Sequence, residues 1–238
     1  MSILIDAGIL LASYIFGSVP FGLLIVKLLT GKDLRNVESG RTGGTNAMRA
    51  AGVGAGFGTA ILDILKSAAT VWLAQIITPD NVWIHVLAPI AAVIGHNHSI
   101  FMIERQENGR LRLRGGAGGA AALGGTFGLW PPAVLIMLPI GILIWWGIGY
   151  ASITTLSVGV MTMIIFAIRA ALGLGPWEYV LYGLIVEILM LWALRPNIKR
   201  LLNGTERRHG LQVKLQQQRE ALKNATQAEG NTKETKKD

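Results

Sequence analysis

The stretch AVLIMLPIGILIWWGIG at residues 133–149 contains no charged side chain anywhere along its length. The apolar sequence extends on both sides of it, almost without a break from Gly115 to Ile168. A helix needs roughly 20 apolar residues to cross a bilayer core of about 30 Å. This region therefore predicts helices that lie in a membrane, divided by the turn signal Pro131-Pro132.

The composition of the whole chain agrees with a lipid environment. Of its 238 residues, 51% are hydrophobic and 15% are charged, whereas a soluble domain carries roughly 25% charged residues. The chain has no cysteine, which excludes disulfides, thiolate metal sites and cysteine nucleophiles together. We predict an all-α integral membrane protein with about seven transmembrane helices. The predicted spans are Leu4–Leu29, Gly52–Ile77, Val82–Ile103, Gly115–Trp130, Ala133–Gly149, Ser152–Ile168 and Pro176–Leu194.

The basic residues indicate the orientation of these spans. With the N-terminus outside, residues 27–49, 104–114 and 195–238 lie in the cytoplasm and hold five, four and eleven of the 22 Lys and Arg residues. The positive-inside rule predicts this asymmetry, and it places the C-terminus in the cytoplasm. Residues 1–202 form the predicted transmembrane domain. Residues 203–238 form a polar, basic and flexible cytoplasmic tail, because they cannot bury enough apolar surface to fold alone.

The first cytoplasmic loop contains SGRTGGTN at residues 39–46, followed by Arg49. Its glycines let consecutive backbone N–H groups converge on one anion. Arg41 and Arg49 add guanidinium groups that suit phosphate. The segment fits a phosphate site, and it also fits a flexible loop anchored by charge. The neutral donors of the loop are Ser39, Thr45 and Asn46.

A second glycine-rich segment, GGAGG at residues 115–119, follows directly after Arg110, Arg112 and Arg114. Basic residues ahead of glycines at a membrane surface suit an anionic head group. Glycine in a membrane helix also serves close packing between helices, which is the alternative explanation.

The segment GHNHS at residues 95–99 closes the third predicted span. His96 and His98 do not share a helix face, and no Asp or Glu stands at a zinc-ligand spacing from them. Neither a metal nor a cofactor is therefore predicted. His96 is a candidate proton acceptor or phosphate donor, with a structural histidine at the membrane interface as the alternative.

Three ionisable residues fall within the predicted spans. Asp63 and Lys66 lie three positions apart on one helix face, so we expect them to pair. Glu187 has no such neighbour and is expected to face the bundle interior or water. The inner end of the last span is either a positive-inside anchor or part of a site, and its polar residues are Arg195, Asn197, Lys199, Arg200 and Glu206.

Four ordered segments carry a resemblance that covers residues 8–206. They are GSVPFG at 17–22; S-G-x-x-G-x-T-N-x-x-R at 39–49 with LDILK at 62–66; GHN at 95–97 with SIF at 99–101 and the glycines at 115–119; and RPNIKRLLNGTE at 195–206. Together they resemble the bacterial acyl-phosphate:glycerol-3-phosphate acyltransferases of the PlsY type.

The resemblance implies seven spans in the bacterial cytoplasmic membrane and an active site that faces the cytoplasm. It implies transfer of an acyl group from acyl-phosphate to the 1-hydroxyl of glycerol 3-phosphate, without metal, acyl carrier protein or nucleic acid. Ser39, Arg49 and Asn197 would be catalytic. Substrate-binding positions would be Thr45, Asn46, Glu206, Gly115, Gly116 and Gly118, to which the residue types add Arg41, His96, Arg112 and Arg114.

This chain departs from the family pattern at four places. Ala117 stands where the family has lysine, Leu194 where it has histidine, and Arg41 where it has asparagine. About nine residues, near 106–114, are inserted before the glycines. Arg41, Arg112 or Arg114 is the expected replacement for the missing lysine charge.

Two alternatives stay open at this point. One is a catalytically weakened paralogue that binds an anionic lipid or a phosphorylated ligand. The other is a small-solute transporter, suggested by the ionisable residues within the spans. The sequence contains no inverted pair of broken spans, which weighs against transport.

Overall fold

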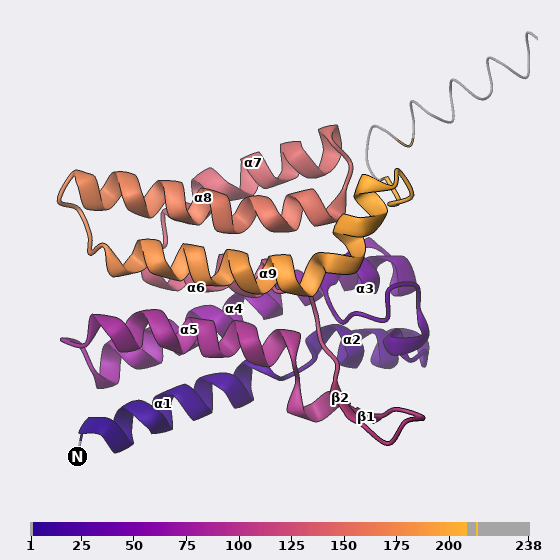
Figure 1. Ribbon diagram of the computed structural model, residues 1–238, viewed down its shortest axis with the longest axis horizontal. Helices are drawn as coiled ribbons and strands as arrows, with labels where there is room; N and C mark the ends of the chain where they lie inside the picture. Colours follow the sequence, from indigo (N-terminus) through magenta and orange to yellow (C-terminus); the bar gives the residue numbers. More distant parts are fainter. Residues whose placement is uncertain (1, 209–212, 214–238) are drawn as a thin grey trace, which may run out of the picture.

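The computed structural model describes residues 2–208 and residue 213. Its helices run side by side along one direction, with short connections at the two ends of the bundle (Figure 1). The helices are α1 Ser2–Gly17, α2 Phe21–Thr30, α3 Gly44–Ala51, α4 Val53–Ile77, α5 Val82–Asn97, α6 Gly119–Leu129, α7 Ala133–Gly147, α8 Ala151–Ala171 and α9 Glu178–Leu202. The smaller elements are the 3-10 turns η1 Leu34–Asn36 and η2 Ile100–Met102 and the strands β1 Ile103–Arg105 and β2 Leu111–Leu113.

The helical membrane class is confirmed. Among the described residues, five helical segments are long and apolar enough to cross a membrane, judged by length and composition. The shorter helices α6 and α7 have 11 and 15 residues, or about 16 and 22 Å at 1.5 Å per residue. The count of seven spans therefore stays a prediction. The five segments are Ile3–Thr30, Val53–Ile77, Val82–Met102, Ala151–Ala171 and Glu178–Leu202.

The basic segments gather at one end of the bundle. The loop before α3, the β1–β2 hairpin and the end of α9 all lie at the right of Figure 1, where α2 also ends. This arrangement agrees with the prediction that they share one side of the membrane, and we refer to this end as the basic end. The predicted tail, residues 203–238, lies outside the described residues except for 203–208 and 213.

Two predicted boundaries are wrong. The sequence predicts a fourth span that begins at Gly115, but α6 begins at Gly119, because Gly118 is left-handed with φ 97° and residues 115–117 are not helical. The seventh span was predicted to end at Leu194, but α9 continues to Leu202 with Pro196 inside it. Pro196 cannot donate to the helix ladder, and the last turns of α9 bend away from its axis (Figure 1).

The prediction of an all-helical chain missed a small hairpin. Strands β1 and β2 pair antiparallel, with Ile103 opposite Leu113. Gly109 closes the turn with φ 77°, and its N–H donates to the carbonyl of Gln106 over 2.8 Å. The dipeptide Asn108-Gly109 is a strong hairpin signal that reveals this turn in the sequence.

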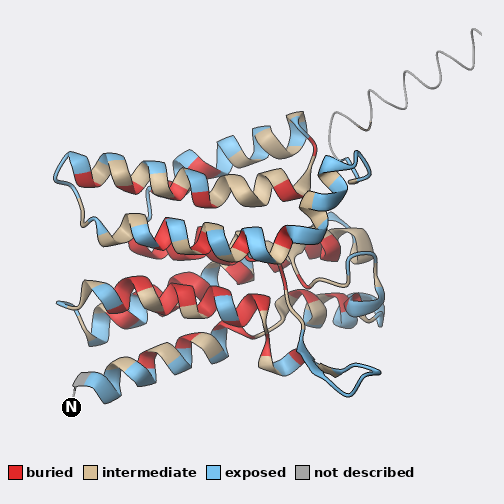
Figure 2. Cartoon of the chain, in the orientation of Figure 1, coloured by how far each residue is buried: buried red, intermediate tan, exposed pale blue. Residues whose placement is uncertain are grey.

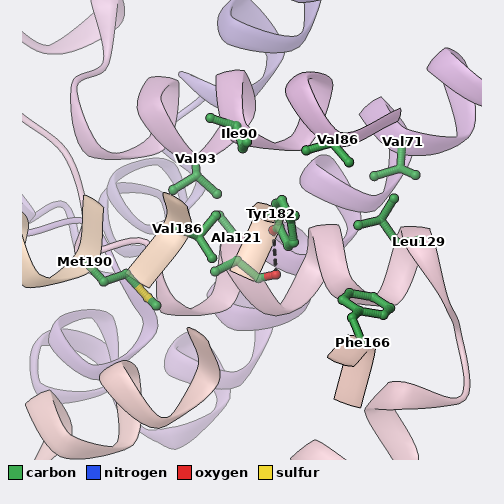
Figure 3. Packing of buried hydrophobic residues seen from close by; sticks show 11 residues of the cluster. Val71, Val86, Ile90, Val93, Ala121, Leu129, Phe166, Tyr182, Val186 and Met190 are labelled. Atoms are coloured by element: carbon green, nitrogen blue, oxygen red, sulfur yellow. Dashed lines mark hydrogen bonds between the residues drawn. The ribbon is translucent and has the colours of Figure 1, made fainter. Parts of the chain in front are cut away.

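The core lies between α4, α5, α6, α8 and α9, as the buried faces in Figure 2 indicate. Figure 3 shows its centre, where the hydroxyl of Tyr182 donates to the carbonyl of Ala122 over 2.7 Å. A Cβ on Gly124 would meet the backbone of Ile64, so α4 and α6 approach too closely for a side chain there. Glu187 packs against Gly159 of α8.

Candidate active site

A cavity of about 690 Å³ opens at the basic end of the bundle. Its polar side is formed by the loop before α3, the first residues of α3 and α6, the last turns of α9 and residues 205–207. Its apolar side is formed by α4, α7 and α8. Because residues 205–207 line the cavity, the predicted domain boundary after residue 202 falls within this site.

The first of two helix N-termini at the cavity belongs to α3. Gly43, Gly44 and Thr45 line the cavity, and α3 begins at Gly44 without a side-chain cap. The first N–H groups of a helix have no intrahelical acceptor, and the helix dipole favours an anion there. The extended backbone at Gly43 thus leads into a helix end suited to phosphate.

The second N-terminus belongs to α6. Ala117, Gly118, Gly119 and Ala120 line the cavity, and α6 also lacks a side-chain cap. Gly118 is left-handed, a conformation that favours glycine. Two uncapped helix N-termini therefore border the same cavity, and each is suited to one anionic group.

Four arginines add positive charge to the polar side: Arg41, Arg49, Arg200 and Arg207. Nη1 of Arg207 lies 2.7 Å from Oε1 of Glu38, which also lines the cavity. Burial lowers the pKa of Arg41, and the neighbouring charge of Arg200 lowers it further. Burial also lowers the pKa of Arg49, while the carboxylate of Glu38 opposes this effect. A guanidinium stays protonated at neutral pH despite such shifts, so these arginines bring fixed positive charge to a lining that also holds Glu38, Asp63 and Glu206.

A chain of polar contacts crosses the cavity. Nη1 of Arg41 donates to Oδ1 of Asn197 over 3.0 Å, and Nη2 donates to the carbonyl of Ala193. Nδ2 of Asn197 donates to Oε1 of Glu206 over 3.0 Å. The hydroxyl of Ser152 donates to Oε2 of Glu206 over 2.6 Å. These contacts tie the first loop to α8, α9 and the segment that follows α9.

Asn46 organises the first loop from within. It is buried, and its Nδ2 lies 2.8 Å from the carbonyl oxygen of Arg41 and 3.0 Å from that of Val37. Both hydrogens of the amide nitrogen are used by these contacts. Asn46 lines the cavity, and so does Ser39 at the exposed rim.

Asp63, Lys66 and His96 form a buried cluster at the inner end of the cavity. Nζ of Lys66 lies 2.7 Å from Oδ1 of Asp63 and donates to the carbonyl of Val19 over 2.9 Å. The predicted pair of Asp63 and Lys66 is therefore present. Nδ1 of His96 lies 3.1 Å from Nζ of Lys66. Asp63 and His96 line the cavity.

Four of the predicted site residues lie outside the cavity lining. Nε of Arg114 lies 2.7 Å from Oε2 of Glu104, and Arg112 is exposed on β2. Gly115 and Gly116 pack on the end of α5, where a Cβ would meet the backbone or ring of His96. Their lack of a side chain thus serves close packing. Among the three arginines expected to replace the family lysine, Arg41 alone lines the cavity.

Sequence reasoning missed Ser152 and the apolar side of the lining. Arg200, which also lines the cavity, is predicted from the sequence to be either a positive-inside anchor or part of a site. The apolar side gave no sequence signal, because residues that face a cavity and residues that face lipid are equally apolar. Its main members are Leu123, Met137, Leu138, Ile142, Trp145, Val158 and Met161.

The comparison with known families gives a match over most of the chain. Residues 7–204 match the family model described as glycerol-3-phosphate acyltransferase. A glycerol-3-phosphate acyltransferase of Rubrobacter xylanophilus is 35% identical over 87% of this chain and 96% of its own length. One from Thermus thermophilus is 37% identical over 86% of this chain and 95% of its own length.

Solved structures agree with this match. The fold is similar to that of PlsY, an integral membrane glycerol 3-phosphate acyltransferase, in its glycerol 3-phosphate form, with a TM-score of 0.73 and 30% identity. That similarity covers 88% of this chain and 98% of the other. The lysophosphatidic acid form gives a TM-score of 0.70 and 28% identity, covering 86% of this chain and 95% of the other. The chain therefore belongs to the glycerol-3-phosphate acyltransferase family.

Proposed function

We propose that this chain transfers an acyl group from an acyl-phosphate to the 1-hydroxyl of glycerol 3-phosphate in the bacterial cytoplasmic membrane. The products are lysophosphatidate and inorganic phosphate. The observation that carries the proposal is one cavity bordered by two helix N-termini and four arginines on its polar side and by apolar helices on the other. Two phosphate groups and one acyl chain fit these three surfaces chemically.

The reaction needs alignment more than a protein nucleophile. The 1-hydroxyl oxygen of glycerol 3-phosphate attacks the acyl carbon, the bond from that carbon to the phosphate oxygen breaks, and phosphate departs. The hydroxyl proton goes to the departing phosphate. Fixed cationic groups and backbone N–H donors lower the barrier by holding the two phosphates and the developing oxyanion.

The residues divide into three proposed roles. Arg49 and the α3 N-terminus hold one phosphate, and Arg41 with the α6 N-terminus holds the other. Asn197 and Glu206 are positioning residues for Arg41, through the contacts described above. The apolar side of the cavity, from Leu123 to Met161, takes the acyl chain.

The experiment is an acyl-transfer assay on the purified protein in lipid nanodiscs. Palmitoyl phosphate and labelled glycerol 3-phosphate are supplied, and labelled lysophosphatidate is measured together with phosphate release. Arg49→Ala is expected to lose about 10- to 100-fold in kcat/KM, because a charge-assisted phosphate contact contributes about 1.5–3 kcal/mol. Lys199→Ala removes an exposed charge outside the cavity and serves as the matched control.

The outcomes separate the remaining alternatives. Lysophosphatidate from the wild type, and its loss in Arg49→Ala alone, supports the transferase. A wild type that binds glycerol 3-phosphate without turnover contradicts it and favours the weakened paralogue. Ala117 and Leu194 both line the cavity and supply no charge where the family has lysine and histidine. This observation favours the weakened paralogue as the second candidate.

A further inference from the structure

The β1–β2 hairpin has two chemically different faces. Side chains alternate along a strand, and the register pairs Ile103 with Leu113, Glu104 with Arg112 and Arg105 with Leu111. One face therefore carries Ile103, Leu111 and Leu113 together with Arg105. The other carries Glu104 and Arg112.

The polar face is linked to the rest of the protein through Glu104. Glu104 forms an ion pair of 2.7 Å with Arg114, the residue that follows β2. Nη1 of Arg114 donates to the carbonyl of Arg35, in the first loop, over 3.3 Å. Met102, which directly precedes β1, is buried. The ion pair between Glu104 and Arg114 thus ties the base of the hairpin to the first loop, while Arg112 on the same face is exposed.

The apolar face points outward. Ile103 is 53% exposed and Leu111 is 71% exposed, and Phe101 just before β1 is 56% exposed. Most of the hairpin is pale blue, the colour of exposed residues, in Figure 2. A hairpin surrounded by water would cover its apolar side chains against the protein. The apolar side chains of this hairpin are instead left uncovered, as expected for a segment that meets lipid.

The position of the hairpin supports a lipid contact. It follows directly on the predicted membrane span Val82–Met102 and lies at the basic end of the bundle, beside α2 in Figure 1. The span Ile3–Thr30 ends at the same level, with Leu28 87% exposed. The apolar face of the hairpin thus lies at the same end of the bundle as the ends of two predicted spans.

We propose that the hairpin lies in the interfacial layer of the adjacent leaflet and contacts anionic phospholipid. Phe101, Ile103 and Leu111 enter the boundary between head groups and acyl chains. Arg105 and Arg110, both exposed, extend to the lipid phosphates. The hairpin lies in the segment between His96 and Gly118, both of which line the cavity. Contact of the hairpin with lipid would therefore restrain the positions of these two residues.

The test uses the absence of cysteine from the chain. Leu111→Cys and Arg112→Cys, on opposite faces, are each labelled with a nitroxide, and Asn108→Cys at the turn is the control. The labelled proteins are placed in nanodiscs of phosphatidylcholine alone or with phosphatidylglycerol. The accessibility of each label to oxygen, which concentrates in lipid, is compared with that to a water-soluble nickel chelate.

The proposal predicts that the label at position 111 is more accessible to oxygen, and that the labels at positions 108 and 112 are more accessible to the nickel chelate. Adding phosphatidylglycerol is expected to raise the ratio of oxygen to nickel accessibility at position 111. The double substitution Arg105→Glu and Arg110→Glu is expected to abolish that increase. Nickel access at 111 equal to that at 108 in both lipids overturns the proposal. Exclusion of both reagents from 111, with broadening between labels, also overturns it and indicates a second copy of the chain on this face. Wild-type elution on size exclusion confirms that each variant is folded.

Discussion

The guanidinium of Arg41 donates to Oδ1 of Asn197 over 3.0 Å, although 156 positions separate the two residues in the sequence. Arg41 lies in the first loop and Asn197 on the bent last turns of α9. Their contact closes the polar side of the cavity, and Asn197 in turn holds the carboxylate of Glu206. The bend at Pro196 and the charge of Arg41 therefore act on the same part of the site.

A double-mutant cycle tests this relationship. Arg41→Ala and Asn197→Ala each lower kcat/KM, but the double variant is expected to lose less than the product of the two losses. A hydrogen bond to a charged group contributes about 1.5–3 kcal/mol, so the coupling is about 10- to 100-fold. Multiplicative losses in the acyl-transfer assay would contradict the coupling. Arg195→Ala, outside the cavity lining, is the control for removal of charge from α9.

Glu206 offers a second prediction on the same chain of contacts. In Glu206→Gln the side-chain oxygen still accepts from Asn197, and the amide N–H can donate to the hydroxyl oxygen of Ser152. We therefore expect activity to fall less than about tenfold, the effect of a neutral hydrogen bond. Glu206→Leu removes both acceptors and leaves Asn197 without its partner, so the loss is larger. Steady-state kinetics of the two variants provide the measurement. Equal losses in both would assign Glu206 a role that needs its charge.

The apolar side of the cavity predicts control of acyl-chain length. Gly141 on α7 lines the cavity, and a Cβ there would meet no atom within 4 Å. Gly141→Phe therefore fills space that a long acyl chain would use, without a clash in the protein. We expect kcat/KM for palmitoyl phosphate to fall about tenfold, the effect of about 1.4 kcal/mol of lost contact.

The matched control for chain length is Leu143→Phe, on the same helix but exposed and outside the cavity lining. Acetyl phosphate is the control substrate, since its chain does not reach the apolar side. Equal losses with both substrates in Gly141→Phe would assign the effect to folding.

The membrane spans followed from the sequence because lipid requires long apolar helices whatever their neighbours are. Packing between segments of the bundle determines where the individual helices begin and end. Gly115 and Gly119 belong to one glycine run, yet only Gly119 is helical. The difference arises because residues 115–118 lie against the end of α5, a contact between segments that local preference does not encode.

The residue types in the site can be predicted from the sequence, but the contacts between them cannot. Arg41 was recognised as a phosphate-binding residue type, but its partner Asn197 is fixed by the fold and not by spacing. Arg112 and Arg114 were expected near the site because they precede the glycines. The hairpin that turns at Asn108-Gly109 instead leaves Arg112 exposed on β2 and Arg114 in contact with Glu104 and with the carbonyl of Arg35.

The buried cluster of Asp63, Lys66 and His96 gives the last prediction. Lys66→Met leaves the carboxylate of Asp63 buried without its ammonium partner. Removing one member of such a pair costs about 3–5 kcal/mol, so the apparent Tm in detergent is expected to fall by several degrees. Asp63→Asn combined with Lys66→Met removes both charges and should recover most of that loss. An unchanged Tm in Lys66→Met would contradict the pairing, whereas a double variant no better than the single one would assign the carboxylate a contact beyond Lys66. His96 lies 3.4 Å from that carboxylate and is the residue to replace next.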